Sequence, residues 1–193
     1  MNIETKADEL GAGTMQAVVV PGNDEPAHKQ VESIEYRARQ LALKTPEGLL
    51  AFGFGSGLLS KAPGTMGTLA AVPVAVFLAY FDLNGFWFLV LTFLLGIWVC
   101  GRVSTMLGVE DYGGIVWDEM VAYWLVVAFV PFHWAWFLAA FVIFRAFDIL
   151  KPWPISLIEE SFQGGLGIML DDVLAAVYTA LILAFIEIKI IGA

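Results

Sequence analysis

The stretch GGIVWDEM, residues 113–120, places two adjacent carboxylates, Asp118 and Glu119, at the entrance to an apolar run. A carboxylate beside lipid or a packed core is costly unless it is paired, neutralised or bound to a cation. Acids also favour the positive end of a helix dipole, which is the simpler explanation of this pair. A second pair, Asp171 and Asp172, lies where a glycine-rich turn enters another apolar run. Two acidic pairs at two helix entrances predict a shared cation.

The composition is typical of a protein that enters or spans a membrane. Hydrophobic residues make up 59% of the chain and charged residues 15%, against roughly 45–50% and 25% in soluble domains. The mean hydropathy is +0.77. The net charge of −9 argues against nucleic-acid binding, which requires clustered Lys and Arg. The chain has one cysteine, Cys100, which excludes an intrachain disulfide and a cysteine-rich metal site, and we expect it to be a packing residue.

Long apolar runs predict the fold. The run 85–107 is the best candidate for a span, because Arg102 is its one charged residue. The run 69–81 is short for a span and contains Pro73, which favours a re-entrant or half-buried helix. Further apolar runs cover residues 120–130, 132–143 and 173–191, with an aromatic-rich break at 131–134. These runs are too long and too rich in Leu and Ala for strands, so we predict an all-α, membrane-embedded helical bundle with short, broken and re-entrant helices.

The chain divides into a polar N-terminal extension, residues 1–46, and a helical domain, residues 47–193. A partly amphipathic helix is predicted over about residues 27–44. It could lie on the membrane, pack on the main body or be solvated. Thr45 and Pro46 are expected to start the next helix as its cap and first residue.

Polar clusters between the apolar runs carry the candidate chemistry. The segment GFGSGLLSKAPGTMGT, residues 53–68, permits either close helix approach or a loop whose backbone N–H groups face a ligand. It lacks the pattern of a P-loop. Further along, Arg145, Asp148 and Lys151 recur every three residues before Pro152 ends the helix. Either the three side chains neutralise one another as a ladder of ion pairs, or Asp148 binds a metal ion while the two bases beside it hold anionic oxygens.

The donor types favour a phosphate-ester site with a hard cation. Oxygen ligands without a suitable Cys or His cluster select Mg²⁺, with Mn²⁺ as an alternative, and neither His28 nor His133 is expected to be a ligand. The candidate catalytic and metal-binding residues are the carboxylates Asp118, Glu119, Asp148, Asp171 and Asp172. The candidate phosphate-binding residues are Ser56, Lys61, Thr65, Arg145 and Lys151. Which carboxylate binds metal and which activates water stays open.

Several motifs in order resemble the phosphatidylglycerophosphatase A family over about residues 49–180. They are GFGSGL (53–58), APGT (62–65), IVWDE (115–119), FR (144–145), FD (147–148), KPWP (151–154), GGLGIM (164–169) and DD (171–172). The five candidate carboxylates match the family's acidic positions, and Arg145 and Lys151 match its basic ones, whereas Lys61 lies in a variable part of the loop. Ser60 replaces a proline of some relatives, and residues 1–46 are longer than the family pattern.

The resemblance implies a bacterial, Mg²⁺-dependent enzyme of the cytoplasmic (inner) membrane, with its active site facing the cytoplasm. It implies hydrolysis of phosphatidylglycerophosphate to phosphatidylglycerol and phosphate by Mg²⁺-assisted attack of water. The expected partners are an anionic phospholipid substrate and the bilayer, with no nucleic acid. Intramembrane acids, broken helices and glycine-rich segments also fit a small ion-coupled transporter, and a lipid-binding scaffold is a third alternative.

Overall fold

The structure is a computed structural model, and it describes residues 27–59, 61–110, 112–153, 155 and 162–191. Residues 1–26 of the N-terminal extension and the side chain of His28 lie outside this part. The elements are α1 (Ala27–Lys44), α2 (Pro46–Ala51), the 3₁₀ helix η1 (Gly53–Leu58), α3 (Pro63–Tyr80), α4 (Phe86–Leu107), α5 (Trp117–Val127), α6 (Trp134–Leu150) and α8 (Gly164–Ile191). The described residues contain no strand, which confirms the all-α prediction.

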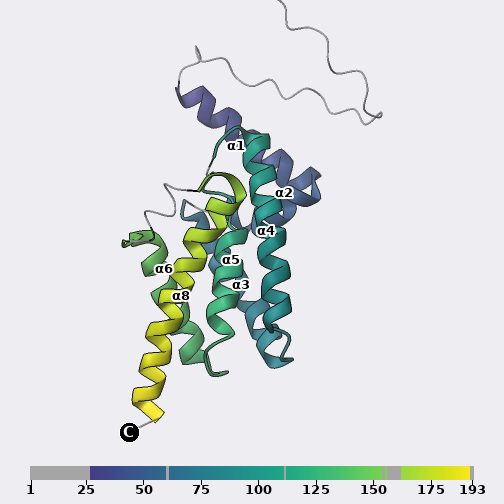
Figure 1. Ribbon diagram of the computed structural model, residues 1–193. Coiled ribbons are helices and arrows are strands. Elements are labelled where there is room, and N and C mark those ends of the chain that lie inside the picture. Colours follow the sequence, from purple (N-terminus) through teal and green to yellow (C-terminus); the bar gives the residue numbers. More distant parts are fainter. Residues whose placement is uncertain (1–26, 60, 111, 154, 156–161, 192–193) are drawn as a thin grey trace, which may run out of the picture.

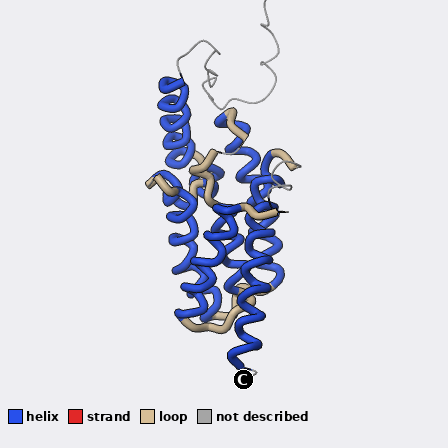
Figure 2. The backbone as a smooth tube through the Cα atoms, turned by 90° about the vertical axis from the view of Figure 1, so that its left-hand side faces the viewer, coloured by secondary structure: helices blue, strands red, loops and turns tan. Residues whose placement is uncertain are grey.

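The short helix α5 forms the centre of the bundle. It packs against α3, α4, α6 and α8, which surround it (Figures 1 and 2). Nine of its 11 residues are buried, and its length of about 16 Å is well below the roughly 30 Å of a bilayer core. The helix therefore belongs to the protein interior rather than to the lipid-facing surface, which confirms the prediction of short helices.

Three helices are long and apolar enough to cross a membrane: α3, α4 and the segment Gly164–Lys189 of α8. Helix α4 agrees with the predicted span. Helix α3 begins at Pro63 rather than at Leu69 and is 18 residues long, so the prediction of an element too short for a span was wrong here. Pro63 supplies a first helical residue, and Gly67 permits contact with Val116 beside α5. The second half of the glycine-rich segment is thus a helix start rather than a loop.

The two ends of the bundle differ in chemistry. The α3–α4 and α5–α6 connections and the C-terminal end of α8 lie at the lower end in Figure 1. Exposed aromatic side chains gather at these connections, and Tyr80 and Phe132 lie 6.2 Å apart between ring centroids. His133 caps α6, because its Nδ1 accepts a hydrogen bond from the Ala135 N–H at 3.2 Å. The predicted aromatic break is confirmed, and this end resembles an interfacial belt.

Helix α1 packs on the main body, against α2, α4 and η1. Its buried face consists of small side chains, Ala38 and Ala42. The expected cap also forms, since the Thr45 hydroxyl accepts a hydrogen bond from the Gly48 N–H at 3.0 Å and Pro46 is the first residue of α2. Of the three placements left open for α1, the structure shows packing against the body.

Helices α4 and α8 approach closely at Gly165. A Cβ atom at this position would lie 1.9 Å from the backbone oxygen of Ile97 and 2.7 Å from the backbone nitrogen of Gly101. Backbone atoms cannot move aside as a flexible side chain can. The glycine is therefore required for the contact between two of the three helices that are long and apolar enough to cross a membrane.

Gly165→Ala is expected to reduce the free energy of unfolding by on the order of 1–3 kcal/mol, the typical cost of overpacking. Thermal unfolding of the detergent-purified protein measures the change. Gly85→Ala is the matched control, because a Cβ there meets no heavy atom within 4 Å. Equal melting temperatures for the two variants would contradict the assigned α4–α8 contact.

Glu47 at the start of α2 predicts a pH-dependent contribution to stability. Its carboxylate accepts a hydrogen bond from Arg102 Nε at 2.9 Å. The pKa of Glu47 is lowered, first by its own backbone N–H and then by Arg102. Because the folded-state pKa lies below the unfolded value of about 4.3, the contribution is present above that value and is lost as the pH falls through the folded-state pKa.

Glu47→Gln should therefore lower the unfolding free energy at pH 7, by less than about 1 kcal/mol because Arg102 is largely solvated, and the difference should vanish in acid. Melting temperatures measured from pH 7 to pH 3 test this. Glu110→Gln is the control, since Glu110 is exposed and has no ion pair among the described residues. A difference between Glu47→Gln and wild type that persists unchanged in acid would refute the role of this carboxylate.

Candidate active site

Five carboxylates converge at the end of the bundle opposite the aromatic connections, and we call them the acidic cluster. The first turn of α5, the last turns of α6 and the third turn of α8 supply them: Asp118, Glu119, Asp148, Asp171 and Asp172. All are buried or half-buried. Because three elements distant in sequence contribute, only the packing of α6 and α8 around α5 brings these side chains together.

Arg145 joins α5 to α6 within this cluster. Its Nη1 lies 3.3 Å from Glu119 Oε1 and 2.5 Å from Asp148 Oδ2. The three side chains are only 11–12% exposed. A guanidinium presents five N–H donors, so one side chain can compensate two carboxylates and still donate elsewhere. The ion pair between Arg145 and Asp148 confirms the first half of the predicted ladder.

Lys151 forms an ion pair with a residue of α8. Helix α6 ends at Leu150, and Lys151 follows it with a left-handed backbone, φ 40°. Its Nζ lies 2.9 Å from Asp171 Oδ2. Because α6 ends one residue before it, Lys151 pairs with Asp171 of α8 and does not extend the ion pair of Arg145 with Asp148.

The acids of α8 lie inside the helix rather than at its entrance. Helix α8 begins at Gly164, so the glycine-rich segment before the acids is helical and the prediction of a second helix entrance was wrong. The dipole explanation applies to Asp118 and Glu119, which lie in the first turn of α5, but not to Asp171 and Asp172. A different compensation is required for this second pair.

Asp172 is the most deeply buried member of the acidic cluster, with 3% of its surface exposed. The charges of Asp148, Asp118 and Glu119 act on it, and all three repel it. Its Oδ2 atom is buried and has no hydrogen-bond partner among the described residues. A buried carboxylate among like charges favours the binding of a cation or a proton.

This donor set fits Mg²⁺ in chemistry. In the described residues, no three acidic, His or Cys side chains are already grouped around one point as a cation site. Mg²⁺ usually takes one or two carboxylates, with waters and substrate phosphates as its remaining ligands. The acidic cluster supplies only oxygen donors, and Asp172 Oδ2 has no hydrogen-bond partner among the described residues. These features suit a Mg²⁺ ion that takes its remaining ligands from water and substrate.

The start of α3 also reaches the cluster; the sequence interpretation included Thr65 of this turn among the phosphate-binding candidates, but not Gly64. A Cβ atom at Gly64 would lie 1.9 Å from Glu119 Oε1 and 2.8 Å from Arg145 Nη2. The backbone of α3 therefore lies directly against these two side chains, and Thr65 follows in the same turn, half-buried. Pro63, a typical first helical residue, was the sequence signal that a helix N-terminus starts here.

The remaining predicted phosphate-binding residues lie apart from the described contacts of the cluster. Ser56 is buried in η1, and its Oγ has no hydrogen-bond partner among the described residues. Lys61 is exposed and lines a different pocket of about 580 Å³ with Glu35, Arg39 and Tyr112. No ion pair of Lys61 with the five carboxylates occurs in the described part of the chain.

Cys100 is fully buried, which confirms its predicted packing role. It also lies close enough to Asp118, Asp172 and Glu119 for their charges to act on its thiol. Helix α4 therefore borders the acidic cluster through Cys100, an uncharged residue.

Comparison with known proteins finds relatives that match most of this chain. A Haemophilus influenzae protein named phosphatidylglycerophosphatase A is 46% identical over 152 residues, which cover 77% of this chain and 93% of that protein. The Escherichia coli protein of the same name is 41% identical over 163 residues, covering 83% and 92%. A Bacteroides thetaiotaomicron protein with the provisional name phosphatidylinositol-3-phosphatase is 40% identical over 147 residues, covering 70% and 90%. No solved structure matches the chain.

The family model described as Phosphatidylglycerophosphatase A matches residues 49–187. This range includes all five carboxylates, Arg145 and Lys151, and it excludes α1. The motif resemblance is thereby confirmed over most of the chain, and the chain belongs to the phosphatidylglycerophosphatase A family.

Proposed function

We propose that this protein is a lipid phosphomonoesterase that hydrolyses phosphatidylglycerophosphate to phosphatidylglycerol and phosphate. The observation that carries the proposal is the convergence of five buried or half-buried carboxylates with Arg145 and Lys151 at one end of a membrane-type bundle. The names of the Haemophilus and Escherichia relatives support the substrate. All three relatives carry phosphatase names and none carries a transporter name, so the transporter alternative gains no support.

The protein acts in a bacterial membrane, and we place it in the cytoplasmic (inner) membrane with the acidic cluster facing the cytoplasm. The relatives named as phosphatidylglycerophosphatases are bacterial, and three helices are suited to crossing a bilayer. The cluster lies at the end of α3 where that helix begins. A headgroup at the membrane surface can reach such a position without leaving its bilayer.

Charge balance requires a cation for this reaction. Among the described residues, the five carboxylates face two bases, Arg145 and Lys151, so an anionic phosphate monoester would be repelled by these groups alone. Asp172, with Asp148, Asp118 and Glu119 around it, would hold Mg²⁺. When bound, Mg²⁺ supplies positive charge to the phosphate and makes water a better nucleophile at neutral pH.

The protein's own groups would orient the phosphate. Arg145 Nε is buried without a hydrogen-bond partner among the described residues, and Arg145 Nη2 faces the backbone at Gly64. The first turn of α3 adds the positive end of a helix dipole. Arg145 and this turn would therefore hold the phosphate oxygens while charge develops on them, and Lys151 would keep Asp171 in position.

Phosphatidylinositol 3-phosphate is the second candidate substrate. The observation that favours it is the name of the Bacteroides relative, which matches this chain at 40% identity. Both lipids present a phosphate monoester above a diacyl anchor, so the acidic cluster alone does not separate them. Parallel assays of the two lipids decide between these headgroups.

Purified protein should release phosphate from phosphatidylglycerophosphate in detergent micelles with Mg²⁺, and a chelator should abolish release until Mg²⁺ is restored. Asp172→Asn and Asp118→Asn should each lower kcat by on the order of 100-fold or more, because they remove charge from the cation site. Asp82→Asn is the matched control, since Asp82 is exposed in the α3–α4 connection and Asn tolerates its φ of 55°. Full activity in both cluster variants would show that the site is elsewhere.

Arg145 should be required for both stability and activity. Arg145→Met removes the guanidinium that pairs with Glu119 and Asp148. We expect it to lower the free energy of unfolding by about 3–5 kcal/mol, the typical cost of breaking a buried ion pair. Arg145→Lys keeps the charge but not the fork, so stability should largely recover while kcat stays reduced by about 10-fold or more. Thermal unfolding and phosphate release, measured on the same samples, separate the two effects. An Arg145→Met protein as stable as wild type would rule out this clamp.

A further inference from the structure

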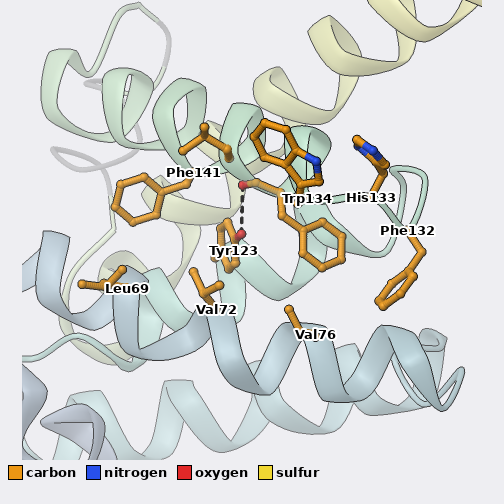
Figure 3. A pocket seen from close by; sticks show the side chains of 10 residues that line it. Leu69, Val72, Val76, Tyr123, Phe132, His133, Trp134 and Phe141 are labelled. Carbon is orange, nitrogen blue, oxygen red and sulfur yellow. Dashed lines mark hydrogen bonds between the residues drawn. The ribbon is translucent and has the colours of Figure 1, made fainter.

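An apolar groove lies between α3 and α6, with α5 as its floor (Figure 3). Its volume is about 600 Å³. The side chains that line it include Leu69, Val72, Val76, Tyr123, Phe137 and Phe141, with His133 at the end toward the α5–α6 connection. The Tyr123 hydroxyl donates a hydrogen bond to the Phe137 backbone oxygen at 3.0 Å, and the His133 Nδ1 accepts one from the Ala135 N–H. The groove therefore suits a hydrocarbon ligand rather than a polar one.

On α5 and α6 the groove begins one helical turn from residues of the site, and on α3 it begins five residues after Gly64. Tyr123 follows Glu119 by four residues on α5, and Phe141 precedes Arg145 by four residues on α6. Residues four apart share a helix face and are separated by about 6 Å along the axis. Leu69 follows Gly64 by five residues on α3. Gly64, Glu119 and Arg145 are the groups that meet in the cluster, so the groove continues from their contact.

The groove is open on its outer side and extends toward the other end of the bundle. Leu69 is 52% exposed, and Leu138 on the opposite rim is 55% exposed. Helix α3, which forms one wall, is long and apolar enough to span a membrane. From Leu69 to Val76 the wall runs for about 10 Å, and Phe132 and Trp134 of the aromatic connection lie at its far end.

We propose that this groove binds one acyl chain of the lipid whose phosphate occupies the acidic cluster. The inference rests on the proposed phosphatase function and adds a site for the hydrocarbon part of the substrate. A chain that lies along α3 and α6 places its headgroup beside Arg145 and Glu119. Lipid tails are already in an apolar medium, so in a bilayer the groove acts by positioning the phosphate rather than by hydrophobic transfer.

A second apolar cavity, of about 700 Å³, provides an internal comparison. It lies between α4, α5 and α8, and its α4 wall runs from Phe86 to Leu94. Above that wall, the buried side chains of Trp117 and Met169 pack against Gly96, where a Cβ atom would lie 2.9 and 2.4 Å from them. These side chains lie between the cavity's α4 wall and Cys100, where α4 reaches the cluster, whereas its α8 wall includes Val173, the residue after Asp172.

The kinetic test uses single-chain substrates of two, four and six acyl carbons, kept below their micelle concentrations, with the protein in phosphatidylcholine nanodiscs. In water each buried methylene contributes up to about fourfold in kcat/KM. We expect wild type to show this rise, Val72→Trp to lose most of it, and Val90→Trp to retain it. Val90 lines the second cavity and is half-buried like Val72.

The outcomes separate this inference from the proposed function. No phosphate release from any substrate would overturn the phosphatase assignment itself. Release with the same chain-length dependence in wild type and Val72→Trp, or equal losses in both Trp variants, would overturn the groove assignment alone.

A measurement on the wild type covers the case in which Val72→Trp does not fold. A phosphonate analogue of the substrate with a diazirine at the end of its acyl chain is photolysed in the same nanodiscs, and labelled peptides are mapped. Labels on α3 and α6 along the groove that are lost with excess unlabelled phosphonate support the proposal. Equal labelling by a diazirine phosphatidylcholine, or labels confined to the second cavity, would refute it.

Discussion

The ion pairs of Arg145 with Glu119 and Asp148 are the interaction on which the rest of the site depends. They join the buried central helix α5 to α6, and they allow acids from both helices to lie in a region of low dielectric constant. Lys151 and Asp171 form a similar ion pair between the end of α6 and α8. Among the described residues, Arg145 and Lys151 pair with three of the five carboxylates, which supports the proposal of a bound cation.

Close backbone packing makes this convergence possible. Gly64 brings α3 against Glu119 and Arg145, and Gly165 brings α8 against α4. A side chain at Gly165 would meet the backbone of α4, and one at Gly64 would displace the ends of the Glu119 and Arg145 side chains. Small residues, rather than additional charges, therefore set the distances between the helices that bury the charged groups. In a membrane, where lipid competes with every apolar contact, such small-residue interfaces are the usual means of tight helix association.

Together, the acidic cluster and the proposed groove would bind the polar headgroup and one hydrocarbon chain of the same lipid. The acidic cluster lies at one end of the bundle, and the apolar groove continues from it along α3 and α6 toward the aromatic connection. Helix α5 contributes to both, through Glu119 in its first turn and Tyr123 in its second. The half-buried position of the cluster and the membrane-type length of α3 fit a substrate that stays in its bilayer.

The sequence by itself determined the all-α class, the span at α4, the aromatic break before α6 and the five carboxylates, because hydrophobic runs and charged residues are local properties that a single chain displays. It did not determine where α3 and α8 begin, because glycine in their first turns weakens the helical signal, although Pro63 is a typical first helical residue. Nor did it determine that Lys151 pairs with Asp171 or that Lys61 is exposed at another pocket. Both depend on where helices end in space, and that was decided by the tertiary structure.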